Sequence, residues 1–310
     1  MPKAVRKLIS EEKGSAVVVL ALAMVALIGF AALVIDVGLL FAERTKMLAA
    51  ADASAMAGVQ DIFSSEQKAE VSAEEYIEKN GFASSYFEIN ADAEERTVAV
   101  KGKKLVSLFF ARIFDEEAAF VSAEAKARAE GLVKASGVVP LGIEEQPLVK
   151  GQLYTLKIAA PPTVRGGTFG ALSLGGTGAD RYRENLKYGY DKPISVGDII
   201  DTETGNMANP TRTAVEYRMQ SCNHVPQCTH EHYERGCPRI VIVPVYEPYL
   251  IEGQQLKKVV VKGFAAFLLD GQTKVGTDCY IRGYFIDYVF KGETDDTQGD
   301  YGAYGVKLIQ

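Results

Sequence analysis

The pattern of apolar and polar positions divides the chain into a long apolar helix and a folded remainder. From Ala16 to Ile35, twenty consecutive residues carry no charge, and as a helix they would span about 30 Å, the thickness of a hydrocarbon core. A cleaved secretory signal, with an apolar region of about 7–15 residues, and a buried soluble helix are the competing interpretations. Because the helical pattern continues beyond Ile35, we predict a retained membrane helix.

The residues after the apolar run extend this helix. Residues 15–60 are predicted to form one transmembrane and stem helix of roughly 69 Å. Small residues recur every three or four positions in its outer part and predict a narrow face: Ala49, Ala53, Met56, Ala57 and Gln60. Alanine is the best helix former, so the stretch can serve as a rigid spacer. The alternative is that this face docks on a neighbouring helix of this chain or of a partner.

Four further residues of the helix are candidates for helix packing: Gly29, Asp36, Gly38 and Asp52. Gly29 and Gly38 would let a second helix approach closely within the membrane. Asp36 directly follows the apolar run. A carboxylate is costly at the bilayer centre and much less costly at its surface. We therefore expect Asp36 to be solvated at the interface or paired with a basic group or helix end of a partner.

Basic residues flank the apolar run unequally. Four precede it, Lys3, Arg6, Lys7 and Lys13, whereas the next twenty residues hold only Arg44 and Lys46. Because cytoplasmic flanks carry the excess of Lys and Arg, we predict a single-pass protein of the cell membrane. Residues 1–14 would lie in the cytoplasm and the rest of the chain outside.

The patterns after residue 60 predict an α+β fold class. Residues 61–130 read as a small α+β unit: a helix that stops near Gly81, a strand pair at YFEIN and RTVAVKG, and a strand at AAFVSAEAKARAE. The helix presents one apolar face, made of Ala69, Ala73, Tyr76 and Ile77. Residues 131–150 contain two prolines and are predicted to be a linker.

The last half of the chain has the composition of a β structure. Short runs rich in Val, Ile and Tyr, separated by Gly-rich turns, predict a β-rich extracytoplasmic domain over residues 151–310, built as a sheet or a sandwich-like module. The final residues, DDTQGDYGAYGVKLIQ, are expected to be turn-rich.

Charge and motifs exclude several functions. The 310 residues carry a net charge of -6 without a basic stripe, so no nucleic-acid partner is expected. The chain lacks the G-x-S-x-G, H-E-x-x-H and phosphate-loop patterns. We therefore expect no enzyme activity and, zinc aside, no cofactor.

One stretch, SCNHVPQCTHEHYERGCP, concentrates reactive side chains: Cys222, His224, Cys228, His230, His232 and Cys237. The fourth cysteine of the chain is Cys279. An even number of cysteines in an extracytoplasmic domain predicts two disulfides among Cys222, Cys228, Cys237 and Cys279. Zinc is the alternative, because thiolate and imidazole are its usual ligands, although the spacing is not that of common C-x-x-C pairs. Free thiols are the third interpretation.

The motif AAADASAMAG follows an apolar helix that begins just after Lys13-Gly14, and together they resemble the Tad family. These TadE/TadG-like proteins are associated with tight-adherence, or Flp-type, pilus assembly. Asp36, near the outer end of the helix, and Asp52, within the motif, carry the resemblance. It implies a membrane-associated protein whose partners are other pilus-assembly or pilin-like proteins, with self-association through the N-terminal helix as a further expectation.

The resemblance has one departure. Gly14–Ser15 is a candidate processing site, but cleaved pilins usually have Glu at the fifth residue after the cut, where this chain has Val19. The favoured function is therefore a membrane-anchored, non-catalytic TadG-like protein of pilus assembly or cell-surface attachment. The alternatives are a pilin-like subunit of an extracellular filament and a metal-dependent envelope enzyme that uses the Cys/His residues.

Overall fold

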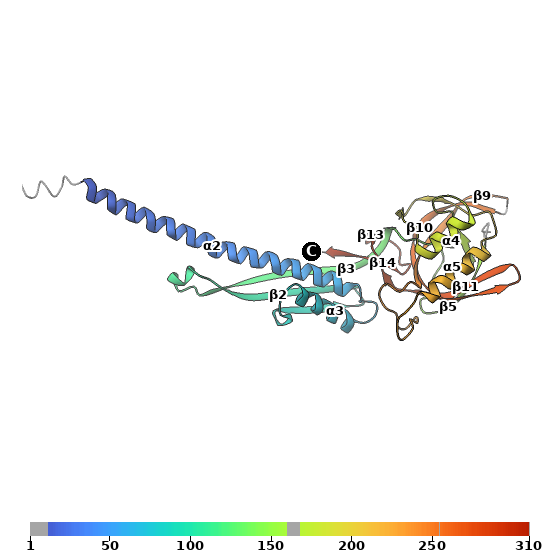
Figure 1. Ribbon diagram of the computed structural model, residues 1–310, viewed down its shortest axis with the longest axis horizontal. Helices are drawn as coiled ribbons and strands as arrows, with labels where there is room; N and C mark the ends of the chain where they lie inside the picture. Colours follow the sequence, from blue (N-terminus) through green and yellow to red (C-terminus); the bar gives the residue numbers. More distant parts are fainter. Residues whose placement is uncertain (1–11, 160–167, 254, 310) are drawn as a thin grey trace, which may run out of the picture.

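The chain forms an elongated molecule in which one long helix projects from a folded body (Figure 1). The computed structural model describes residues 12–159, 168–253 and 255–309. Helix α2 (Glu12–Val59) begins the described part. Most of the predicted cytoplasmic segment 1–14 therefore lies outside the described residues. The β-rich head stands at the opposite end of the molecule from the start of α2 (Figure 1).

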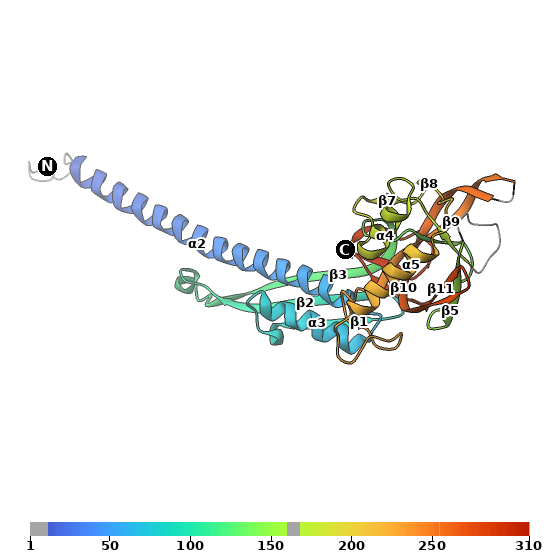
Figure 2. The same ribbon diagram turned by 45° about the vertical axis from the view of Figure 1, so that its right-hand side comes forward.

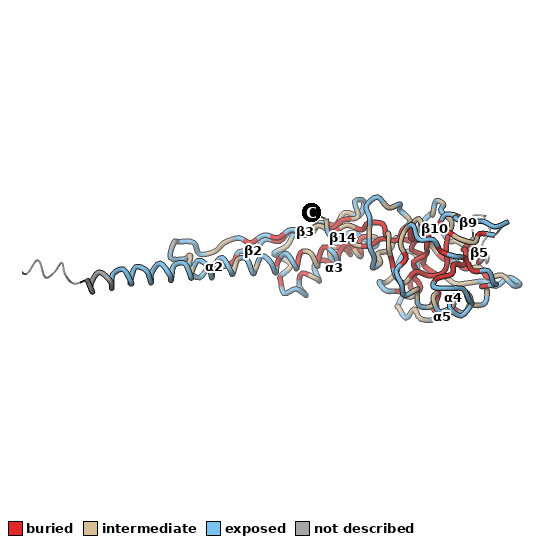
Figure 3. The backbone as a smooth tube through the Cα atoms, turned by 90° about the horizontal axis from the view of Figure 1, so that it is seen from above, coloured by how far each residue is buried: buried red, intermediate tan, exposed pale blue. Residues whose placement is uncertain are grey.

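The first half of α2 is uncovered by the rest of the described chain. Residues 17–35 are all exposed except Ala32, which is half-buried, and Figure 3 shows this stretch as an exposed rod. The helix is long and apolar enough to cross a membrane. Water contact with this surface would be unfavourable by about 25 cal/mol per Å² of apolar area, so the exposed apolar helix indicates a membrane anchor.

The second half of α2 packs into a small α+β unit. Helix α3 (Glu66–Lys79) lies beside it, and three antiparallel strands follow: β1 (Phe87–Asp92), β2 (Thr97–Ser107) and β3 (Ala118–Ala135). Short 3-10 helices precede β1 and follow β2, at η1 (Ser84–Tyr86) and η2 (Ala111–Phe114). The mixed α+β fold class predicted from the sequence is confirmed.

Local signals set the limits of α3. The Ser65 side chain accepts a 3.0 Å hydrogen bond from the backbone N–H of Lys68, which caps the helix start. The helix ends before Gly81, which has a φ of +83°, a conformation that glycine adopts without strain. Its predicted apolar face is largely correct, since Ala69, Ala73 and Ile77 are buried while Tyr76 is half-buried.

Small residues bring α2 close to the sheet and to α3. On β3, Ala123, Ala125, Ala127 and Ala129 alternate with polar residues and are buried in the same core as α2. At Gly58 of α2, a Cβ atom would stand 2.8 Å from the carbonyl oxygen of Ala69 on α3. The small residues of the Tad-like motif therefore allow α2 to pack closely against α3 and the sheet.

The face of α2 predicted from the sequence is not the face that packs. Of its members, only Ala57 is buried; Ala49 and Met56 are exposed, and Ala53 and Gln60 are half-buried. The buried surface instead comprises Met47, Ala50, Ala51, Ser54, Ala55, Ala57, Gly58 and Val59. It is wider than the predicted stripe because both the sheet and α3 pack against the helix.

Two further expectations about the chain course are wrong. The expected linker 131–150 contains the end of β3 and all of β4 (Leu141–Glu144). The expected turn-rich end contains β14 (Ala303–Ile309), which pairs with β3 of the first sheet. Three short strands complete that sheet: β7 (Ile194–Ser195), β12 (Tyr288–Val289) and β13 (Gly292–Asp295). The end of the chain thus returns from the head to the stem.

The head is a ring of paired strands. The ring runs through β4, β6 (Thr168–Ala171), β5 (Leu153–Ala159), β11 (Asp278–Ile286), β10 (Gln255–Val275) and β9 (Ile240–Glu252), and closes by the pairing of β9 with β4. A further strand, β8 (Ile199–Asp201), pairs with β10. Helix α4 (Ala179–Tyr188) packs on α5 (Ala208–Gln220), which packs on β10 and β11 (Figure 2).

Alternation along β9 shows why the head has two cores. Val241, Val243 and Val245 point into the core shared with Phe169 and Phe267. The intervening Ile240 and Ile242 belong to a second core on the other face of the strand. Both faces of this strand are buried, which explains its continuous apolar sequence.

Candidate functional site

The hairpin formed by β2 and β3 reaches back along α2 toward the membrane anchor (Figure 1). Its tip contains η2, whose first backbone N–H groups point at Asp36. The Oδ1 atom of Asp36 accepts a hydrogen bond from the N–H of Phe109 at 2.8 Å, and Oδ2 accepts from Phe110 at 2.9 Å and Ala111 at 2.7 Å. A carboxylate at such a helix start is well stabilised. We call this arrangement the Asp36 clasp.

The clasp fixes the height of the hairpin tip along α2. Because Asp36 follows the apolar run directly, the tip lies where the predicted bilayer ends. Two apolar tip side chains are strongly exposed, Phe109 at 69% and Ile113 at 78%. Farther from the tip, an ion pair between Lys104 and Glu43 also joins the hairpin to α2. The tip therefore presents apolar side chains beside the end of the membrane helix.

The structure changes the interpretation of Asp36. Sequence reasoning expected a solvated carboxylate or one paired with a partner's basic group or helix end. The carboxylate is instead buried, with 4% exposure, and its partner is a helix start 73–75 residues later in the same chain. The available signal was the apolar sequence LFFARIF between two predicted strands, in which Phe109 and Ile113 are exposed in the structure.

The other helix-packing candidates make few contacts. At Gly29 and Gly38, no atom of the described chain beyond the adjoining turns of α2 lies within 4 Å of where a Cβ would stand, so both remain accessible to lipid or another helix. Asp52 is half-buried on α2. Gly14 and Ser15 lie within α2, and processing between them stays a prediction. Gly58, which sequence reasoning did not single out, makes the closest helix contact.

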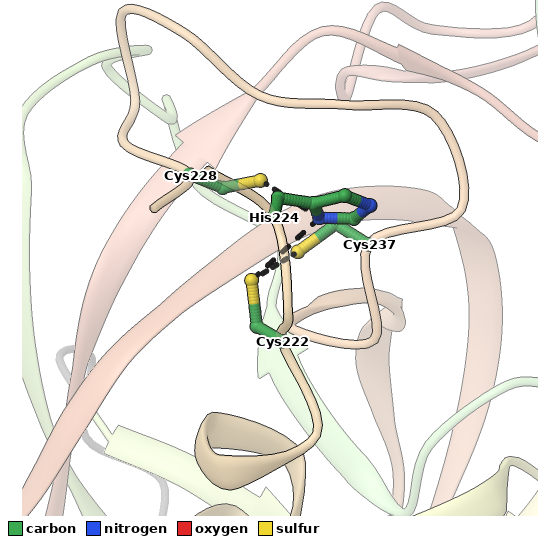
Figure 4. Close-up of side chains that lie close together, drawn as sticks. All are labelled: Cys222, His224, Cys228 and Cys237. Carbon is green, nitrogen blue, oxygen red and sulfur yellow. Dashed lines mark hydrogen bonds between the residues drawn. The ribbon is translucent and has the colours of Figure 1, made fainter. Parts of the chain in front are cut away.

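The second candidate site lies in the loop 221–239, between α5 and β9. It brings together Cys222, His224, Cys228 and Cys237, whose ligand atoms all lie within 4.8 Å of one another (Figure 4). The Sγ atom of Cys228 is 3.3 Å from Nδ1 of His224, and that of Cys222 is 3.7 Å from the same nitrogen. The Sγ atoms of Cys222 and Cys237 are 3.6 Å apart. We call these four residues the Cys/His cluster.

The thiols of the cluster have different proton affinities. Burial disfavours the Cys222 thiolate, but hydrogen bonds from the backbone and ring of His224, from the Cys237 thiol and from the Cys228 backbone together lower the pKa of Cys222 to about 6. Burial raises the pKa of Cys237 to about 12. The backbone N–H of Glu234 donates to Sγ of Cys228 at 3.4 Å. The loop therefore directs hydrogen-bond donors at the sulfur atoms of Cys222 and Cys228, and at Cys222 these bonds favour the thiolate.

The remaining predicted ligands stand apart from the cluster. The His230 ring stacks on Tyr284 with 4.2 Å between centroids, and Nε2 of His232 is 3.4 Å from Glu234. Cys279 is buried in the first core of the head with Ile281 and Phe285, and burial raises its pKa to about 11.

The predicted pair of disulfides is not shown by this structure, in which all four cysteines are free. Cys279 lies on β11 in the first core of the head, whereas the other three cysteines belong to the loop. Strand register decides which face a residue on β11 occupies, and the sequence did not reveal it. Two bridges would need Cys279 beside one of the loop thiols.

Contacts around the loop tie it to both parts of the molecule. Nη2 of Arg235 donates a 2.6 Å hydrogen bond to Oδ2 of Asp61, in the turn between α2 and α3. The buried Arg239 side chain donates from Nη1 to the carbonyl oxygen of Cys228 and from Nε to that of Leu269, both at 2.8 Å. Sequence reasoning missed these arginines. Their positions two residues before and two residues after Cys237 were the available signal.

Comparisons with known proteins identify the N-terminal segment. The Tad family model, described as Flp pilus-assembly TadE/G-like, matches residues 14–61. This segment comprises the apolar helix and the small-residue motif, and the match confirms the resemblance predicted there. No curated protein and no solved structure matched the chain.

Proposed function

We propose that this chain is a membrane-anchored, non-catalytic protein of pilus assembly or cell-surface attachment, with its head outside the cell. The observation that carries the proposal is the uncovered apolar helix within the TadE/G-like segment 14–61. In this proposal the part of α2 up to Ile35 spans the membrane. The part from Asp36 onward is the stem, and the strand ring presents a binding surface to other pilus-assembly proteins.

The charge pattern supports this orientation. Lys3, Arg6, Lys7 and Lys13 precede the span, and the cytoplasmic side is where such an excess is favoured. On the other side, Glu43 is paired with Lys104 of the hairpin. Near the membrane, the negative charge of Glu43 on the stem is therefore neutralised by a lysine of the adjoining sheet.

The hairpin gives the stem a mechanical role. A single helix leaving a bilayer can tilt freely, but the Asp36 clasp holds a second element beside it. Phe109 and Ile113 at the tip would rest at the membrane surface, where apolar and aromatic side chains are favoured. The anchor then has two contacts with lipid, which would hold the head at a defined distance from the membrane.

A second candidate function rests on the same uncovered helix. In a filament subunit, residues 17–35 would pack against helices of neighbouring subunits instead of lipid, and the accessible Gly29 and Gly38 suit such packing. Val19 at the position of the usual pilin Glu weighs against this alternative.

Removal of the chain from the cells that produce it tests the proposal. We expect surface pili or attachment to be lost, to be restored by the full chain, and not to be restored by residues 37–310 secreted without the anchor. Sheared surface filaments should lack the chain. Unchanged pili and attachment without the chain would contradict the proposal, and enrichment of the chain in sheared filaments would favour the subunit alternative.

A further inference from the structure

The Cys/His cluster has the dimensions of a tetrahedral metal site. With Zn–S and Zn–N bonds of about 2.3 and 2.1 Å, tetrahedral ligand atoms stand roughly 3.6–3.8 Å apart. Three pairs come close to these separations, at 3.3 Å, 3.6 Å and 3.7 Å for Cys228–His224, Cys222–Cys237 and Cys222–His224, and the other three pairs lie within 4.8 Å. All four ligand atoms converge on one point from a single loop (Figure 4).

The chemistry of the four ligand atoms indicates which metal ions the cluster would bind. Three thiols and one imidazole form a soft, four-ligand set, which is typical of structural zinc and unlike the oxygen ligands of calcium or magnesium. Cys228 and Cys237 are buried, with 2% and 3% exposure. Three buried or half-buried thiols side by side are poorly explained by a disulfide, because one bridge would leave the third thiol unpaired next to it.

We propose that Cys222, His224, Cys228 and Cys237 bind one zinc ion, with His224 ligating through Nδ1. Four protein ligands complete a tetrahedral shell and leave no position for substrate, so the ion is structural. The metal-dependent enzyme considered from the sequence would need an open position that this ligand set does not provide.

Zinc would hold the loop in the shape that joins head and stem. Three contacts of the loop cross this junction: Arg235 to Asp61 at 2.6 Å, the Tyr233 hydroxyl to the carbonyl oxygen of Asp287 at 2.7 Å, and the Gly236 N–H to the Tyr288 hydroxyl at 2.7 Å. Tyr233, Arg235 and Gly236 all lie between the third and fourth ligands, Cys228 and Cys237. Closing the loop on a metal would therefore position all three junction contacts.

The loop is also held from the side of the head. Arg218 of α5 is buried and donates from Nη1 to the carbonyl oxygen of Pro238 at 2.6 Å, and Arg239 donates to the carbonyl oxygen of Cys228. A zinc ion with three thiolates and one imidazole carries a net charge of -1. These two guanidinium groups bind the backbone beside the ligands and offset that charge.

Metal content of the full chain tests the proposal. The protein is purified in detergent without chelators, and zinc is counted by elemental mass spectrometry. We expect about one zinc per chain in the wild type and in two matched controls outside the cluster, His232→Ala and Cys279→Ser. Since loss of a supporting contact alone weakens metal sites about tenfold or more, His224→Ala and Cys228→Ser should lose at least that much zinc affinity.

A spectroscopic measurement on the wild type tests the metal site without relying on variants that could fail to fold. Reduced, metal-free wild type is titrated with CoCl₂, and a tetrahedral thiolate site gives cobalt charge-transfer and ligand-field absorption that ZnCl₂ abolishes. Absence of this absorption, or a purified chain that lacks zinc and is two hydrogens lighter than the reduced formula, would overturn the proposal. Equal zinc affinity in His224→Ala and His232→Ala would overturn the ligand assignment.

The structural role has its own readout. Hydrogen exchange is followed in residues 221–239 and 58–64 before and after chelation. We expect faster exchange in both segments without metal, because the junction contacts depend on the loop. Unchanged exchange in residues 58–64 after complete metal removal would overturn the proposed link between metal and stem.

Discussion

The Oδ2 atom of Asp36 accepts a 2.7 Å hydrogen bond from the backbone N–H of Ala111, 75 residues away in the sequence. This contact joins the first residue after the apolar run to the tip of a long hairpin. It fixes where the folded body begins relative to the membrane anchor. Several consequences can be measured.

Replacing Asp36 by alanine should release the hairpin tip. Three backbone N–H groups lose a charged acceptor, and hydrogen bonds to charged groups contribute about 2 kcal/mol. We expect faster hydrogen exchange and easier proteolysis in residues 107–118, with the head unaffected. Glu116→Ala, an exposed substitution at the same tip, should leave both unchanged. If residues 107–118 were equally protected from exchange and proteolysis in Asp36→Ala and the wild type, Asp36 would not hold the hairpin tip.

The placement of the tip at the membrane surface can be followed by fluorescence, because the chain contains no tryptophan. Phe109 is exposed, so Phe109→Trp should fold normally and report the environment of the tip. In nanodiscs we expect blue-shifted emission that brominated lipids quench. Tyr249→Trp, at an exposed position on the head, should be neither shifted nor quenched. Similar emission and quenching from the two variants would rule out contact between the tip and lipid.

The role of the small-residue motif can be tested with two glycines of one helix. A Cβ at Gly58 would stand 2.8 Å from a backbone oxygen of α3, whereas nothing lies within 4 Å at Gly29. Gly58→Ala should therefore destabilise the stem by about 1–3 kcal/mol. Gly29→Ala should be neutral or slightly stabilising, because alanine is the better helix former. Thermal unfolding in detergent compares the two, and equal melting temperatures would show that α2 and α3 do not pack as described.

Chelation should weaken the folded head if the Cys/His cluster binds zinc. At a free zinc concentration about 100 times the Kd, binding contributes about 2.7 kcal/mol. Removing the metal should lower the melting temperature by roughly 5–10 °C. Zinc should restore the loss in the wild type and in His232→Ala, but not in His224→Ala. A wild-type melting temperature that is insensitive to chelator would contradict a structural ion.

Periodicity in the sequence was sufficient to identify the elements that bury one face. The alternation of alanine with charged residues in AAFVSAEAKARAE predicted β3, and the spacing of Ala69, Ala73 and Ile77 predicted the buried face of α3. The apolar run to Ile35 and the motif after it predicted the anchor and the TadE/G-like segment, which the family comparison confirms.

The pairing of distant strands could not be predicted from the sequence. It depends on strand register and on contacts between segments that lie far apart in the chain. The return of β14 to β3 joins residues about 180 positions apart, and no local pattern marks it. Asp36 likewise gave no sign that its partner was the tip of a hairpin. In the Cys/His stretch, the sequence offered six candidate ligands, and only the loop conformation separates the four that lie together from His230 and His232.

Protease accessibility in cells that produce the full chain tests most directly whether α2 anchors the chain with its head outside. We expect the chain to remain in carbonate-washed membranes until detergent is added. Protease added outside intact protoplasts should digest the head and leave a protected fragment containing residues 1–35. Recovery of the full-length chain from the soluble cytosolic fraction without detergent, or a head that resists protease until the membrane is broken, would contradict this arrangement.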